Sequence, residues 1–301
     1  MTDLAMSRDL EMEQSARKGA AARRMRKIRD FALIGTASVF VLFFVLLPFY
    51  WMLKSSFQTN AEILAAPPLW FPTEFTLFAY ERALRLIPFI RYMGNSLFVS
   101  VIAAAISTIL STSAAYVIAR HRFRGVTIIL SVILFTQLIP AITRTFPIYF
   151  LIQGLGLINN YIGLIIAYVG FSIPFAVLML QGYFQTSCPP ELEEAGLIDG
   201  CTWFSAFLRI VLPVSLPGIA AISIFTFLGA WNDFLWASLL LNQGEMKTIQ
   251  VGLRDFIGEF GLSQANVFMA ACTMAAIPSL LMFRFLQRWM VSGIAAGSVK
   301  G

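Results

Sequence analysis

The sequence predicts an all-α membrane protein that crosses the bilayer six times. Of its 301 residues, 58% are hydrophobic and only 13% are charged, whereas a soluble domain carries about 25% charged residues. Several apolar runs reach the length of about 20 residues that a helix needs to cross the hydrocarbon core. Arg and Lys gather in short segments beside these runs, as they do at the cytoplasmic ends of membrane helices. Together these observations favour a helical bundle in a membrane over a water-soluble fold.

The chain divides into a basic tail, a first span, an outer loop and a larger transmembrane domain. We expect the tail at 1–30, either bound to anionic membrane lipid or solvated, and the first span at 31–53. Prolines and aromatic residues alternate in the outer loop, 54–90, which suits the membrane–water interface. The domain covers 91–290, and a cytoplasmic tail follows at 291–301. The five helices of the transmembrane domain are expected at about 95–119, 126–152, 161–184, 214–241 and 267–290.

The basic segments set the expected orientation. Residues 120–125 are short and strongly basic, so this loop belongs on the cytoplasmic side together with both termini. The loop at 185–213 then also lies inside. It carries carboxylates as well as Arg209, but acidic residues contribute little to orientation.

The cytoplasmic loop 185–213 has a helical pattern of its own. Prolines at 189–190 stop the preceding helix and suit the first turn of a new one, where Glu193 and Glu194 favour the helix dipole. Gly200 is expected to end this short helix, and a second apolar run leads to Pro213. We therefore expect two short helices at a sharp angle, presented to a groove in another protein.

The spacing in this loop resembles the signature of the inner-membrane permeases of binding-protein-dependent ABC importers. That signature is Glu-Ala-Ala, three residues, Gly, nine residues, then Ile-x-Leu-Pro. The matching residues here are Glu194, Ala195, Gly196, Gly200, Ile210, Leu212 and Pro213. Gly196 departs from the usual Ala, which removes one methyl group and predicts a looser helix. Residues 154–157, 231–236 and 293–301 are similar to the second permease of maltose-type carbohydrate importers.

This resemblance implies a type I importer permease fold in a bacterial inner membrane. It implies that the loop docks into a cleft of a cytoplasmic ATP-binding subunit and couples ATP hydrolysis to transport. Glu193 and Asp199 also belong to the residues expected to carry out this coupling. Glu194 would pair with a basic residue of that cleft, and the alternative is a solvated charge at a helix N-terminus. The implied partners are a second related permease, two copies of the ATP-binding subunit and a periplasmic or extracellular solute-binding protein. A homodimer of permeases stays open.

The chain is not expected to be an enzyme. It lacks the Gly-x-x-x-x-Gly-Lys-Ser/Thr arrangement that cradles phosphates, so ATP and Mg belong to the partner subunits and no cofactor is expected here. Three cysteines without paired spacing predict neither a disulfide framework nor a metal site. No soluble basic domain is present, so nucleic acid is not an expected partner.

The resemblance implies a sugar or oligosaccharide as substrate, and three residues of the spans are candidates for its path. Arg144 lies between two prolines, and a lone Arg in lipid costs about 2.5–3.5 kcal/mol. It either lines the path and attracts an acidic, uronate-type oligosaccharide, or snorkels to the interface or pairs within the complex. Asn232 and Asp233 are candidate path residues, with packing or interface roles as the alternative.

Other functions stay as alternatives. The solute could be another compound such as a sugar phosphate. A proton-coupled secondary transporter would need buried ionisable groups, whereas the spans hold one carboxylate, Asp233, near an end, and the single histidine, His121, lies in a loop. A membrane hydrolase would need a nucleophile and a base within reach of each other, and the spans hold no such set. A purely structural protein would not need the loop pattern.

Overall fold

The computed structural model describes residues 2–121, 123–258 and 264–297, and all regular elements in these ranges are helical. Arg122 of the expected basic loop and residues 298–301 of the expected tail lie outside the described residues. The chain forms two compact units, Met1–Ser55 and Ser56–Gly301. Each unit is considered by itself.

The first unit is a single long helix, α1 (Thr2–Ser56). It runs without a break through the expected tail and the first expected span. The reason is that residues 2–30 are rich in Ala, Met, Glu, Arg and Lys, which are strong helix formers. Only its later part, Met25–Ser56, is apolar and long enough to cross a membrane.

The second unit holds three long helices, α4 (Phe89–Arg120), α7 (Tyr161–Ser187) and α14 (Ala265–Gly297). The expected outer loop contains two short ones, α2 (Asn60–Ile63) and α3 (Phe78–Leu86). The other elements, in chain order, are α5 (Val126–Leu138), α6 (Ala141–Gly154), α8 (Pro190–Ile198), α9 (Trp203–Ala206), a π-helical turn (Phe207–Val211), α10 (Leu212–Val214), α11 (Leu216–Trp231), α12 (Leu235–Leu240), a 3₁₀ turn (Gly244–Met246) and α13 (Ile249–Gly258).

Four helices in the described part of the chain are long and apolar enough to cross a membrane, and up to six spans result if each of two bent pairs counts as one. One pair is α5 and α6, bent by 105°. Ile139, which precedes Pro140, is extended (ψ 122°) because proline disfavours the helical conformation in the residue before it. The expected span 126–152 is therefore two helices. The second pair is Trp203–Val214 with α11, bent by 75°.

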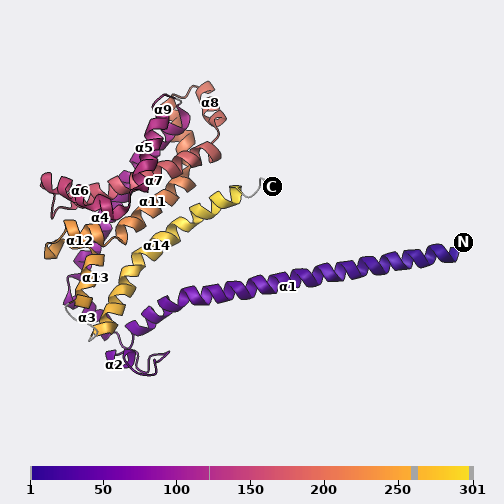
Figure 1. Cartoon of the computed structure of the whole chain (residues 1–301), viewed down its shortest axis with the longest axis horizontal. Coiled ribbons are helices and arrows are strands. Elements are labelled where there is room, and N and C mark those ends of the chain that lie inside the picture. Colours follow the sequence, from indigo (N-terminus) through magenta and orange to yellow (C-terminus); the bar gives the residue numbers. More distant parts are fainter. Residues whose placement is uncertain (1, 122, 259–263, 298–301) are drawn as a thin grey trace. The chain divides into compact units, whose positions relative to one another are not determined.

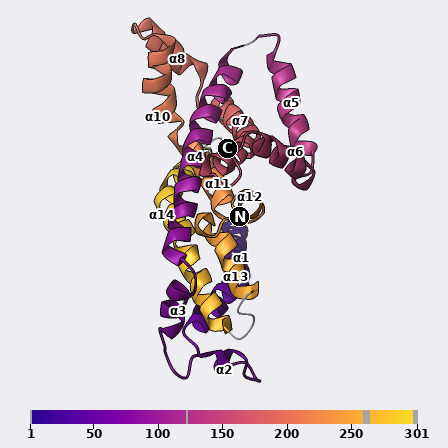
Figure 2. The ribbon, with the colours of Figure 1, turned by 90° about the vertical axis from the view of Figure 1, so that its left-hand side faces the viewer.

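The core of the second unit forms where α4 packs against α7 and α11, and where α11 packs against α14. Small buried residues line α4, among them Ala103 and Ala115, and small residues let membrane helices approach closely. Both views of this unit place α8 at one end and α2 and α3 at the other (Figures 1 and 2). The expected cytoplasmic loop and the expected outer loop thus lie at opposite ends of the bundle.

Candidate functional site

The loop after α7 folds into a short helix with defined ends. Pro189 is extended (ψ 142°), and α8 begins at Pro190. The helix ends where Gly200 takes a φ of +87°, a left-handed conformation that glycine adopts without strain. The Gly200 amide donates to the Leu197 carbonyl at 3.1 Å, and the Cys201 amide donates to the Gly196 carbonyl at 2.9 Å. These two bonds form a Schellman cap, so Gly200 ends the helix as its position in the sequence predicts.

The second half of the loop is helical from Trp203 to Val214. Thr202 begins it, because its hydroxyl accepts a hydrogen bond from the Ser205 amide at 3.2 Å. The run includes one π-helical turn, Phe207–Val211. Such turns are rare and occur often at functional sites.

Gly196 lies in close contact with Ile210 across these two helical segments. A Cβ atom at position 196 would lie only 2.3 Å from Cδ1 of Ile210. The missing methyl group therefore makes room for another residue of the same signature. We expected glycine to loosen the helix, but Gly196 is buried and close-packed.

The remaining signature residues differ in exposure. Those on the outside of the loop are Glu194, Ala195, Asp199 and Pro213, whereas Ile210 and Leu212 are half-buried. The loop also exposes large apolar side chains, of which the most exposed are Ile198 at 86%, Phe204 at 70% and Trp203 at 55%. Ile198 follows Glu194 by four residues, so both lie on one face of α8. A carboxylate beside exposed apolar groups is suited to a protein partner.

Glu193 points the other way. It is 1% exposed and binds Arg120 and Tyr116 of α4. The sequence pattern groups Glu193 with Glu194 as a residue of the expected coupling loop and gives no sign that either partner binds it. Arg120 had a signal, a charge at the end of a span, but this was interpreted only as an orientation signal.

Of the candidate path residues, Asp233 lines a cavity of about 240 Å³ whose wall comes mainly from α7, α11 and α12. The Asp233 carboxylate accepts hydrogen bonds from the Tyr168 hydroxyl at 2.9 Å and from the Ala237 amide at 3.0 Å. The Arg144 guanidinium lies 4.8 Å from the ring centre of Phe171, which also lines the cavity. The rings of Phe171 and Trp236 pack at 4.9 Å in its wall.

Asn232 does not join this group. Its side-chain amide donates to the Leu228 carbonyl at 3.0 Å, and the residue is exposed. Of the three candidate path residues, only Asp233 lines the cavity; Arg144 contacts the cavity residue Phe171 without lining the cavity itself, and Asn232 lies outside it. Tyr168, Phe171 and Trp236 are cavity residues that the sequence did not single out, because aromatic residues are common in every span.

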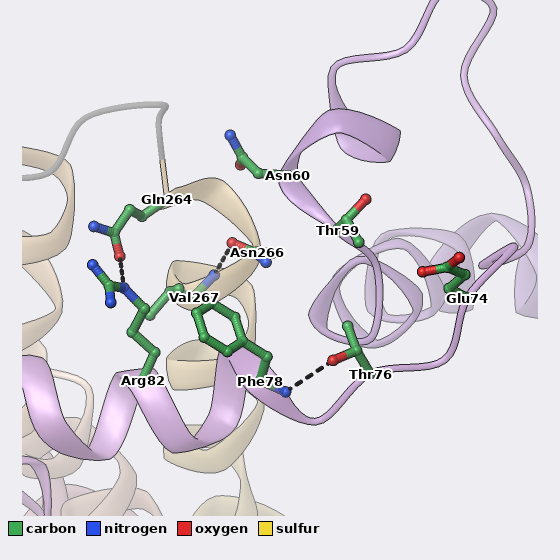
Figure 3. A pocket seen from close by; sticks show the side chains of 9 residues that line it. All are labelled: Thr59, Asn60, Glu74, Thr76, Phe78, Arg82, Gln264, Asn266 and Val267. Carbon is green, nitrogen blue, oxygen red and sulfur yellow. Dashed lines mark hydrogen bonds between the residues drawn. The ribbon is translucent and has the colours of Figure 1, made fainter.

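A second cavity, of about 430 Å³, lies at the end of the bundle that holds α2 and α3. Figure 3 shows the side chains that line it. The segment from Thr59 to Arg82 and the start of α14 line it. The Arg82 Nε donates to the Gln264 side-chain oxygen at 3.0 Å across its wall (Figure 3). None of the site residues predicted from the sequence lines this cavity.

A helical bundle with apolar spans, a cavity between them and a capped helical loop at one end fits the membrane subunit of a transporter. Residues 107–295 match the family described as "Binding-protein-dependent transport system inner membrane component". The chain belongs to this family, as the loop signature predicts.

Known proteins of similar sequence support the same assignment. The chain is 35% identical to the diacetylchitobiose uptake system permease protein DasC of Streptomyces coelicolor, over 84% of this chain and 91% of that protein. It is 34% identical to the sulfoquinovosyl glycerol transport system permease protein SmoH of Agrobacterium fabrum, over 85% and 89% of the two chains. These relatives place it in the carbohydrate-uptake group of ABC importer permeases.

A solved structure confirms the fold. A bacterial ABC transporter involved in the import of the acidic polysaccharide alginate matches with a TM-score of 0.73 and 24% identity, over 86% of this chain and 96% of that one. The all-α importer permease fold is thus confirmed. As a permease of the inner membrane, the chain is a multi-pass, non-enzymatic component, and ATP is used by a partner subunit. The secondary-transporter and hydrolase alternatives are wrong.

Proposed function

We propose that this chain forms part of the channel of an ATP-driven importer, and that its loop 185–213 docks into the cytoplasmic ATP-binding subunit. The observation that carries the proposal is the position of Glu194. It is exposed on α8, at the end of the bundle opposite α2 and α3, on the face that also exposes Ile198. A charged group flanked by apolar side chains can pair with a basic residue at the centre of a desolvated interface.

The test is Glu194→Lys in the assembled importer. We expect uptake to fail while ATP hydrolysis becomes independent of the binding protein, or the ATP-binding subunit to be lost on purification. Glu191→Lys is the matched control, because Glu191 is also exposed on α8 but lies outside the signature. Normal assembly and normal uptake in Glu194→Lys would contradict the docking.

We further propose that the cavity at Asp233 contacts the substrate and that the substrate is an oligosaccharide with an acidic group. Aromatic rings such as Phe171 and Trp236 can stack on a sugar ring, and a carboxylate such as that of Asp233 can accept hydrogen bonds from hydroxyl groups. The volume of about 240 Å³ is below the roughly 300–1,000 Å³ of pockets that enclose a whole ligand. It would hold one part of a longer chain.

Arg144 supports the acidic group in this proposal. Its Nε is buried and makes no hydrogen bond among the described residues, so this donor is free for a ligand. One relative belongs to a sulfoquinovosyl glycerol system and another to a diacetylchitobiose system, so one name indicates a sulfonated sugar and the other a neutral one. A guanidinium binds carboxylates and sulfonates through paired N–H donors.

Uptake of acidic and neutral oligosaccharides of equal length separates these alternatives. We expect Arg144→Ala to lower uptake of the acidic sugar only, and Arg144→Lys, which keeps the charge, to retain part of it. Equal uptake of the acidic sugar by Arg144→Ala and the unaltered chain would reject the role of Arg144.

The proposed assembly contains a second related permease, two copies of the ATP-binding subunit and a solute-binding protein, with both termini of this chain in the cytoplasm. The family description supports the binding protein. Co-purification of the complex, followed by mass measurement of the intact particle, tests the stoichiometry and separates a heterodimer of permeases from a homodimer.

A further inference from the structure

Arg120, the last residue of α4, contacts three segments at once. Its Nε forms an ion pair with the carboxylate of Glu193 on α8. Its Nη1 donates to the carbonyl of Phe184 at 3.3 Å, and its Nη2 donates to the carbonyl of Cys188 at 2.5 Å. The Arg120 and Glu193 side chains are only 7% and 2% exposed. The pair therefore lies inside the protein, at the junction of α4, α7 and α8.

Tyr116 completes this arrangement from one turn earlier on α4. Its hydroxyl donates to Oε2 of Glu193 at 2.8 Å, while Arg120 takes Oε1. Residues four apart lie on the same helix face, so α4 holds both oxygens of one carboxylate. The Tyr116 ring also packs at 4.5 Å on Phe207 in the π-helical turn.

The chemistry explains why these groups are together. The last carbonyls of a helix have no partner within the helix, and a cation near them is favourable. Arg120 supplies that cation at the end of α7. A buried carboxylate needs a partner and filled hydrogen-bonding positions, and Glu193 obtains them from Arg120 and Tyr116. Only Arg has a planar fork that reaches a carboxylate and two carbonyls together.

Helix α4 also contacts the wall of the cavity of about 240 Å³ that Asp233 lines. Ser107 of α4 is 13 residues before Arg120, which is about 20 Å along a helix. Its hydroxyl lies 2.6 Å from that of Ser172, which lines the cavity beside Asp233. A displacement of the cytoplasmic end of α4 can therefore reach the cavity wall through one rigid helix.

We propose that Glu193, Arg120 and Tyr116 form a latch that fixes the coupling helix α8 to α4. This inference rests on the proposed docking of the loop. The adjacent glutamates then have separate roles. Glu194 faces the ATP-binding subunit, and Glu193 is a positioning residue that faces the permease. When the ATPase moves α8, the latch makes α4 move with it, and α4 carries the movement to the cavity.

The first experiment compares Glu193→Gln with Glu194→Gln in the complete importer in proteoliposomes, with Glu191→Gln as the control. The measured quantities are the amount of ATP-binding subunit retained and the sugar imported per ATP hydrolysed. We expect Glu193→Gln to retain the ATP-binding subunit but to lower the import ratio by about 5- to 150-fold, the usual range of coupling between sites. Arg120→Lys should behave in the same way, and Glu191→Gln should match the unaltered chain.

A normal import ratio in Glu193→Gln would overturn the latch, and so would loss of the ATP-binding subunit from this variant, because Glu193 would then be a docking residue. If Glu194→Gln and Glu194→Lys change neither docking nor transport, the proposed docking fails instead. The two failures are thus distinguishable.

A second measurement uses no variant, so its result does not depend on whether a variant folds. In the unaltered complex, hydrogen exchange in α8 and in the last turn of α4 should change together when ATP and vanadate close the ATPase. Exchange that changes in α8 and stays constant in the last turn of α4 would overturn the proposal.

Discussion

Gly196 offers a direct test of the packing inside the loop 185–213. Carbon atoms in contact lie about 3.5–4.0 Å apart, whereas a Cβ at position 196 would lie 2.3 Å from Cδ1 of Ile210. In Gly196→Ala that atom must withdraw by about 1.2–1.7 Å. Overpacking of this kind costs about 1–3 kcal/mol, toward the lower end where the displaced atom is the far end of a flexible side chain, as Cδ1 of Ile210 is. The better helix propensity of Ala returns about 1 kcal/mol. We therefore expect a net loss of about 0–2 kcal/mol.

Ile210→Val removes the clashing atom and leaves the rest of the contact. The Cγ1 atom of Ile210 would lie 3.8 Å from the new Cβ, which is an ordinary contact. Ile210→Val alone should cost about 0.5–1.5 kcal/mol. Gly196→Ala should then be neutral or stabilising in the Val background, so the two substitutions should couple by about 1–3 kcal/mol.

The assay is a double-mutant cycle on the purified complex. Thermal unfolding of the four forms gives the coupling free energy, and binding-protein-stimulated ATP hydrolysis shows whether the loop still works. Additivity of the two substitutions within about 0.5 kcal/mol would refute the contact between Gly196 and Ile210.

Two further predictions concern other parts of the second unit. Gly163→Ala should be strongly destabilising, because its Cβ would lie 2.4 Å from the backbone oxygen of Leu157 and the turn before α7 would have to shift. Gly170→Ala in the same helix, with no atom within 4 Å of its Cβ, is the matched control and should unfold at an equal or higher temperature. Glu62 lies in α2, and its pKa is lowered from 4.5 to about 2, chiefly because the hydroxyl of Thr73, in the loop after α2, donates to its carboxylate. The Thr73 amide donates to the same carboxylate at 2.9 Å. A lowered carboxyl pKa stabilises the loop above pH 4.5 and ceases to do so as the pH falls toward 2, so exchange of the Thr73 amide should rise over this window. The rise should be absent in Glu62→Gln, and an identical rise in that variant would contradict the assignment to Glu62.

Much of the fold follows from local pattern. Apolar runs of membrane-spanning length predict helices wherever they occur, because each backbone group in lipid needs a partner within its own helix. The expected span at 161–184 thus corresponds to α7, Tyr161–Ser187. The bend between α5 and α6 is harder to predict from the sequence, because a proline in a span can either kink one helix or separate two helices. The neighbouring conformation at Ile139 decides between these outcomes.

In the loop 185–213, too, local sequence decides some features and tertiary packing decides others. Pro190 and Gly200 fix the ends of α8 by their own backbone chemistry, so the sequence alone determines that helix. Glu193 and Glu194 are chemically identical neighbours, and no local pattern separates them. Only the tertiary structure does so, because the α-helix turns them to different sides and brings Arg120, distant in sequence, against one of them. Composition and spacing thus determine that this chain is a helical permease with a two-helix loop between spans, and long-range packing decides that Glu193 is buried and Glu194 is exposed.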